Sequence, residues 1–228
     1  MDAERTWQVI ERERTRLVEV LDGLGHQQWE RPSLCEGWTV RDVAAHLTVV
    51  SDPPSWTVLL GQAVRVRGNP HRLNTAVTKH RAQRPPREIV AILRRNVASR
   101  DLPFVTSDKN VLFDLLVHVQ DIAVPLGIDV PMPTDAAADS ATRVWTMGWP
   151  FRAQRRLAGF TLIATDAPWS VGSGPEVHGP IAALLLLLTG RPAALPQLSG
   201  PGAAGVARTL AGHADDAASG ALTERKPS

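Results

Sequence analysis

Residues 112–121, LFDLLVHVQD, place an aspartate and a histidine four residues apart within a run of apolar residues. From Asn110 to Val124, ten of fifteen residues are apolar, which predicts a buried helix. A spacing of four places Asp114 and His118 on one helical face, one turn apart. Because a buried carboxylate and a buried imidazole need compensating partners, the pair predicts either an internal hydrogen bond or two ligands of one divalent metal ion.

A third ligand is expected in the segment LCEGWTVRDVAAHL, residues 34–47. Thr39 and Asp42 have the spacing of a capping box, with Asp in place of the usual Glu, so a helix should begin at Val40. His46 lies about two turns into that helix, among apolar neighbours. A lone histidine in such a place is commonly a packed core residue. As a ligand, it would complete a site of two imidazoles and one carboxylate, which suits zinc.

Three strings of the sequence together resemble the actinobacterial maleylpyruvate isomerase family of mycothiol-dependent enzymes, within the DinB-like superfamily. In chain order they are WTVRDVAAHL, DLLVHVQDIAVPLG and GPEVHGPIAALLLLLTGR. The resemblance covers about residues 5–210. It implies an α+β protein in which an N-terminal four-helix bundle carries a histidine, acid, histidine zinc site and a smaller C-terminal α/β domain closes over it. By motif position, the ligands fall on His46, Asp114 and His118.

The resemblance also implies a reaction. The nucleophile of the family is the thiol of mycothiol, a cosubstrate that is activated on zinc at the position left open by three protein ligands. Its addition to an electrophilic carbon leads to S-transfer or to cis–trans isomerisation. The chain departs from the family pattern at Asp114, where the family has Glu, and this leaves the substrate unassigned. Two other functions stay open: metal-dependent hydrolysis of a small molecule, and binding of a metal or ligand without turnover.

Four further residues are candidates for the site or its surroundings. Negative charge that develops on a substrate needs a cation, and Arg191 and His178 are the catalytic candidates. Arg191 equally suits a structural bond to the last carbonyls of the preceding helix. Asp121 is expected to accept a ring N–H from His46 or His118, or else to bond a backbone amide. Cys35 stands in a loop with no base nearby in sequence, and we interpret it as a packing residue.

The chain should divide into a metal-binding helix bundle over residues 1–128, a C-terminal α/β domain over 134–210 and a disordered tail over 211–228. Periodicity, prolines and glycines predict helices and short strands. The helices expected for the bundle are 3–23, 40–50, 55–66, 86–100 and 109–124; a linker follows at 124–133, then a helix at 135–148, strands at 160–165 and 169–171, and a helix at 180–190.

Composition and charge limit the partners. A single cysteine excludes internal disulfides, and the N-terminus lacks an apolar signal region, so we expect a cytoplasmic protein. The apolar run 181–188 is far shorter than the roughly 20 residues that cross a membrane. We expect a monomer or homodimer that binds a small-molecule substrate and a low-molecular-weight thiol.

The segment from Arg65 to Arg100 carries ten Lys or Arg residues and one acid, Glu88. It predicts either a solvated face of the bundle or a rim that attracts an anionic small molecule. Specific nucleic-acid binding is not expected, because the segment lacks interleaved aromatic residues and any known binding motif.

Overall fold

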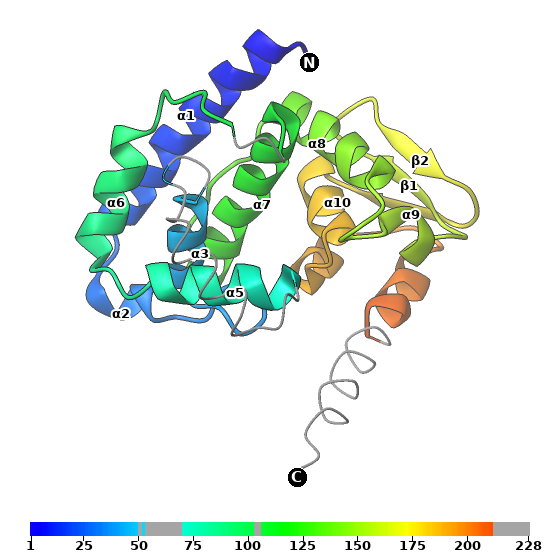
Figure 1. Cartoon of the computed structure of the whole chain (residues 1–228). Coiled ribbons are helices and arrows are strands. Elements are labelled where there is room, and N and C mark those ends of the chain that lie inside the picture. Colours follow the sequence, from blue (N-terminus) through cyan, green and yellow to red (C-terminus); the bar gives the residue numbers. More distant parts are fainter. Residues whose placement is uncertain (50–51, 53–69, 103–105, 212–228) are drawn as a thin grey trace. The chain divides into compact units, whose positions relative to one another are not determined.

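The computed structural model describes residues 1–49, 52, 70–102 and 106–211 (Figure 1). The chain divides into two compact units, Met1–Pro131 and Met132–Ser228. The first unit is helical, and the second combines helices with a small sheet, so the protein is α+β as the sequence predicts. No helix within the described ranges is long and apolar enough to cross a lipid bilayer.

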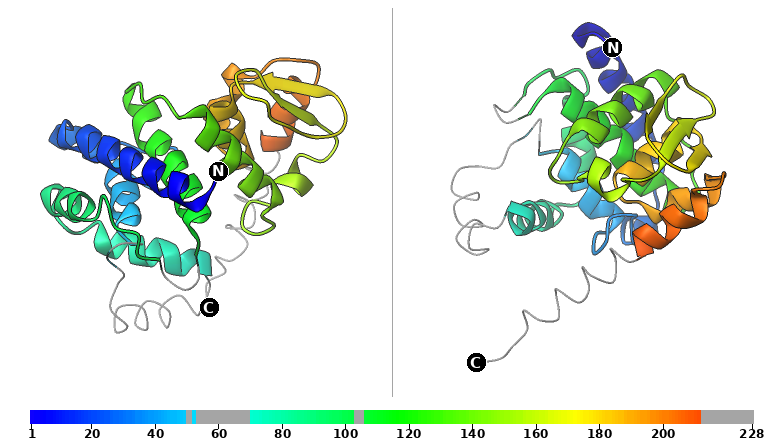
Figure 2. Two further views of the ribbon diagram at one scale, coloured as in Figure 1. Left: turned by 90° about the horizontal axis from the view of Figure 1, so that it is seen from above. Right: turned by 90° about the vertical axis from the view of Figure 1, so that its right-hand side faces the viewer.

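Four helices of the first unit pack in a ring. They are α1 (Ala3–Asp22), α3 (Val40–Leu47), α6 (Pro86–Arg95) and α7 (Asp108–Leu126). Helices α1 and α3 each contact both α6 and α7, and the left-hand view of Figure 2 shows α1 beside α7. Two further helices pack against α3, namely α2 (His26–Trp29) and α5 (Pro70–Arg81). The ring brings residues of α3 next to the middle of α7.

Local signals set where α3 and α7 begin and end. The capping box of α3 is confirmed: the Thr39 hydroxyl accepts the Asp42 amide, and Asp42 accepts the Thr39 amide in return. Helix α7 begins after Ser107, whose hydroxyl accepts the Asn110 amide. It ends at Gly127, which adopts a left-handed conformation with φ 68°, as is common for glycine at a helix C-terminus.

The helix ends differ from the prediction at two places. Helix α7 continues through Pro125 to Leu126, so the first three residues of the predicted linker 124–133 are helical. Helix α6 ends at Arg95 rather than at residue 100. The reason is tertiary: the buried Arg14 of α1 takes the carbonyls of the residues that follow α6 as acceptors. Those carbonyls belong to Asn96, Val97 and Ser99.

Two of the expected segments lie outside the described residues, and several helices were not predicted: α2, α5, the short helix Ala153–Arg156 and the helix at 203–211. The helix expected at 55–66 lies outside the described residues. So does the predicted tail, apart from its first residue, Ala211. Helix α5, which begins at Pro70, was not predicted, because its apolar residues are too few to give a clear helical period.

The second unit contains a three-stranded mixed sheet in the order β2-β1-β3. Strand β1 (Thr161–Ala164) runs antiparallel to β2 (Ser170–Gly172) and parallel to β3 (Glu176–Gly179). The apolar helix α10 (Ile181–Leu188) packs against α8 (Thr134–Thr146) and β1. A short helix α9 (Ala153–Arg156) contacts α8, a 3-10 helix η1 (Pro192–Gln197) contacts α10, and residues 203–211 are helical.

Candidate metal centre

Three side chains predicted as ligands converge where α3 meets α7. His46 Nε2 lies 3.5 Å from Asp114 Oδ2, and His118 Nε2 lies 3.3 Å from Asp114 Oδ1. One donor atom from each of the three residues can be chosen so that all lie within 4.8 Å of one another. The contact between α3 and α7 therefore brings His46 to the pair that the four-residue spacing had already placed on one face.

These distances fit a metal site better than a set of direct hydrogen bonds. In a tetrahedral site with bonds of about 2.1 Å, neighbouring ligand atoms lie about 3.4 Å apart. The nitrogen-to-oxygen distances of 3.3 and 3.5 Å agree with that spacing. A direct hydrogen bond between imidazolium and carboxylate is shorter, about 2.7–2.9 Å. The two histidine nitrogens face different oxygens of the Asp114 carboxylate, and one donor atom from each residue lies within 4.8 Å of the others, a group compact enough to surround one divalent ion.

Neighbouring side chains of the group also shift the pKa values of Asp114 and His118. Burial raises the pKa of Asp114, but the charge of His118 and hydrogen bonds from His118 and His46 outweigh it, so the pKa of Asp114 lies well below its ordinary value. Burial lowers the pKa of His118, yet the charge and hydrogen bond of Asp114 and the bonds from Asp121 and Cys35 raise it well above its ordinary value. His118 therefore lies between two carboxylates, Asp114 and Asp121, whose negative charges a divalent ion would balance.

Asp121 orients His118 from the side opposite Asp114. Its Oδ2 lies 2.7 Å from His118 Nδ1, and its side chain is fully buried. This confirms that Asp121 accepts a ring N–H, and it selects His118 rather than His46 as the donor. With the Nδ1 proton held by Asp121, His118 Nε2 is the nitrogen that faces Asp114 and can bind a metal.

Cys35 belongs to this site, contrary to our interpretation of it as a packing residue. Its thiol donates to Asp121 Oδ2 over 3.0 Å and lies 3.8 Å from His118 Nδ1. The loop is held in place by the Leu34 amide, which donates to the Asp121 carbonyl over 3.1 Å. Cys35, His118 and Asp121 form a second group of potential metal donors. No local pattern could reveal this contact, because its partners lie 86 residues apart.

Trp38 packs against both imidazole rings. Its ring centroid lies 5.3 Å from that of His46 and 6.5 Å from that of His118, and it is nearly parallel to the latter, at 13°. The two imidazoles lie 4.9 Å apart, edge to face. His46 Nδ1 is buried and has no hydrogen-bond partner among the described residues. Packing against Trp38 and the contact of Nε2 with Asp114 therefore orient His46, with no hydrogen bond at Nδ1 from the described residues.

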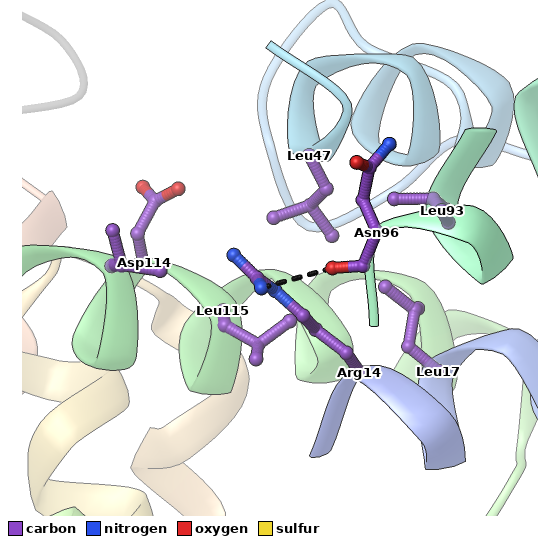
Figure 3. Close-up of a pocket in the computed structure, with 8 residues that line it drawn as sticks. Arg14, Leu17, Leu47, Leu93, Asn96, Asp114 and Leu115 are labelled. Atoms are coloured by element: carbon purple, nitrogen blue, oxygen red, sulfur yellow. Dashed lines mark hydrogen bonds between the residues drawn. The ribbon is translucent and has the colours of Figure 1, made fainter. Parts of the chain in front are cut away.

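A small pocket of about 20 Å³ lies on the other side of Asp114. Figure 3 shows Arg14 reaching from α1 toward Asn96, with Asp114 and Leu115 of α7 also lining the space. Such a volume holds about one water molecule. The pocket is too small for a substrate, but it leaves room for small adjustments of the Asp114 side chain.

The other predicted site residues lie in the second unit. His178 belongs to β3, where its Nε2 is 2.9 Å from Glu176 Oε2. Arg191 follows α10 and donates through Nη1 to the Thr189 carbonyl over 2.7 Å, the structural bond that the sequence left as an alternative. The catalytic roles of both residues stay predictions.

Most of the described basic residues in the segment Arg65–Arg100 pair with acids from elsewhere in the chain. Five of its Lys and Arg residues form ion pairs with acids outside the segment. The acids are Asp42 for Lys79, Asp52 for Arg81 and Arg84, Asp22 for Arg94 and Glu4 for Arg100. This pairing favours a face of the bundle over a rim that attracts anions.

Replacing Asp121 with Asn should weaken metal binding without unfolding the protein. The amide can still accept the Nδ1–H of His118, but it lacks the charge that makes the imidazole a better ligand. Loss of such a supporting partner costs about 10–100-fold in metal affinity. Competition with a chromogenic chelator measures the change, with Asp129→Asn, at an exposed position of the same unit, as the control. Equal affinities in Asp121→Asn and wild type would refute the orienting role.

Comparison with known proteins shows which family profile and which solved structures the chain resembles. Residues 10–103 match the sequence profile described as the mycothiol maleylpyruvate isomerase N-terminal domain. The chain resembles the crystal structure of the mycothiol-dependent maleylpyruvate isomerase, with a TM-score of 0.62 and 14% sequence identity over 88% of this chain and 93% of that one. A histidine-to-alanine mutant of that isomerase gives the same TM-score and coverage at 13% identity.

No curated protein sequence matches the chain. At 14% identity, the structural likeness is a likeness of fold. The sequence profile ends before Asp114 and His118, so those two residues rest on the geometry described above. Residues 10–103 belong to the mycothiol maleylpyruvate isomerase N-terminal domain family, and the chain as a whole shares the fold of the mycothiol-dependent maleylpyruvate isomerase.

Proposed function

We propose that the protein is a zinc-dependent enzyme that uses mycothiol as a cosubstrate for S-transfer to, or cis–trans isomerisation of, a small electrophilic substrate. The observation that carries this proposal is the His46, Asp114 and His118 group, in which three side chains offer donor atoms at the spacing of a metal site. Three protein ligands leave one position of a tetrahedral zinc open, as in catalytic rather than structural sites. The fold shared with a mycothiol-dependent isomerase supports the choice of thiol.

The ligand group is reachable from solvent. The Asp114 side chain is 33% exposed and that of His46 is 16% exposed, whereas Asp121 behind His118 is fully buried. A small molecule can therefore approach from the side of Asp114 and His46, while Asp121 keeps His118 in place. Bound zinc would supply a Lewis acid that lowers the pKa of a coordinated thiol.

Cys35, the single cysteine of the chain, is poorly suited to be the nucleophile. Cys35 donates its proton to the Asp121 carboxylate, and a thiolate at that place would lie about 3.0 Å from a like charge. His118 Nδ1 is already committed to the same carboxylate, so it offers no lone pair to take up the thiol proton. An external thiol is therefore the better candidate. Arg191 and His178 are the proposed residues for stabilising negative charge on the substrate.

Protein purified without a metal-affinity tag should contain one divalent ion per chain, most of it zinc. Two imidazoles and one carboxylate suit zinc, and the ion would neutralise the carboxylates of Asp114 and Asp121. Elemental analysis measures the stoichiometry, and His46→Ala and His118→Ala should each lose the ion. His178→Ala, outside the ligand group, is the matched control. Metal retained in both ligand variants would place the ion elsewhere, and absence of stoichiometric metal would remove the basis of the proposal.

A further inference from the structure

A pocket of about 490 Å³ lies in the second unit and is lined by one short segment of the chain. Its lining residues are Pro150, Phe151, Arg152, Arg155 and Arg156. Three of the five are arginines, and no acid is among them. The volume falls within the range of about 300–1,000 Å³ that is typical of small-molecule sites.

Hydrogen bonds hold this segment in place. The Arg152 amide donates to the Gly148 carbonyl, which closes the loop that carries Pro150 and Phe151. Arg156 donates through Nη1 to the Phe151 carbonyl over 3.3 Å and through Nη2 to the carbonyls of the last two residues of α10, over 3.0 and 2.8 Å. Arg156 is thus a structural anchor, which leaves Arg152 and Arg155 to face a ligand.

Arg152 has a backbone conformation that favours glycine. Its φ of 49° and ψ of 38° are left-handed, and among the described residues it is the one non-glycine residue with a positive φ. An L-residue with a Cβ atom pays a conformational cost there that glycine does not. Strained residues of this kind cluster at binding sites, where the surrounding structure holds them. At this position the chain carries an arginine side chain at the edge of the pocket, where a glycine would fit the backbone conformation more easily but would offer no guanidinium.

The charged residues that line the pocket are all arginines. Neither Arg152 nor Arg155 forms an ion pair with an acid in the described part of the chain, and both are exposed. The pKa of Arg156 is lowered mainly by its burial and, to a smaller extent, by the positive charge of nearby Arg191. A pocket lined by one sign of charge attracts ions of the opposite sign.

We infer that this arginine pocket, lined by Pro150, Phe151, Arg152, Arg155 and Arg156, binds a small organic dianion. The planar fork of a guanidinium forms paired hydrogen bonds with carboxylate or phosphate oxygens. Arg152 and Arg155 supply two such groups three residues apart in sequence, while Pro150 and Phe151 offer apolar surface for the carbon part of the ligand. The inference is independent of the metal centre and of the proposed reaction.

Calorimetric titration of the full chain at low ionic strength tests the inference, with succinate and inorganic phosphate as probes. Succinate should bind at one site per chain. Arg152→Gln and Arg155→Gln should each weaken succinate about tenfold, since a hydrogen bond to a charged group is commonly of that strength. Arg208→Gln, an exposed arginine of the same unit outside the pocket, should leave the affinity unchanged.

Arg152→Gly separates loss of the ligand contact from loss of the fold. Glycine accepts the left-handed conformation freely, so its melting temperature should equal or exceed that of wild type while succinate binding falls as in Arg152→Gln. No succinate binding to wild type, equal weakening in Arg208→Gln, or wild-type affinity in an Arg152→Gln, Arg155→Gln double variant would each overturn the inference. Binding of phosphate but not of succinate would show that the pocket takes an inorganic anion, and it would overturn the inference of an organic dianion.

Discussion

Asp114→Ala should lose its metal ion and all turnover, an effect as large as that expected from loss of either histidine ligand. Asp114 lies between the two histidines, with Oδ2 3.5 Å from His46 Nε2 and Oδ1 3.3 Å from His118 Nε2. Alanine removes the donor and also leaves the charge of His118 without its main partner. The fall in metal affinity should exceed the about 10–100-fold expected for supporting residues such as Asp121.

Asp114→Glu should keep the metal ion that Asp114→Ala loses. A carboxylate with one more methylene is the acid that the family resemblance implies at this position, and the partly exposed Asp114 side chain has room to lengthen. Metal content by elemental analysis and turnover of candidate electrophiles are the two measurements, with Asp129→Ala as the control for loss of an aspartate in the same unit. Full metal content in Asp114→Ala would exclude Asp114 as a ligand.

Turnover should require an added low-molecular-weight thiol, and omission of mycothiol should abolish it. The proposed open metal position faces solvent, whereas the thiol of Cys35 donates to Asp121 and is not placed to attack a substrate. Cys35→Ser should therefore keep activity, because a hydroxyl can donate to the same carboxylate oxygen. Cys35→Ala removes that donor and should weaken metal binding modestly, through Asp121 and His118.

Initial rates with and without mycothiol measure the thiol requirement, with electrophiles and esters as parallel substrates. Equal rates on esters in the presence and absence of thiol would move the assignment to metal-dependent hydrolysis. Loss of turnover in Cys35→Ser with metal content intact would instead make Cys35 part of the reaction. A metal-loaded protein that turns over no substrate of either kind would be a binding protein.

Local structure in this chain is well predicted where the signal is itself local. Thr39 and Asp42 form the expected capping box because both partners lie within one helical turn. The pair Asp114 and His118 shares a face because four residues make about one turn of helix. Strand β3 was missed because its four residues, EVHG, include a charge and a glycine, and it forms by pairing with β1.

What the sequence alone determined is the type of fold, the main helices and a set of three candidate ligands, since helical period, caps and motif order are properties of neighbouring residues. Only the tertiary structure decided that Cys35 and Trp38 lie at the candidate metal centre, that Asp121 contacts His118 rather than His46, and that Arg14 bonds the carbonyls that follow α6. Each of these depends on a contact between segments far apart in the chain, most often across the packing of one helix or loop on another. Such contacts are set by the three-dimensional arrangement of whole elements, which no spacing within one element encodes.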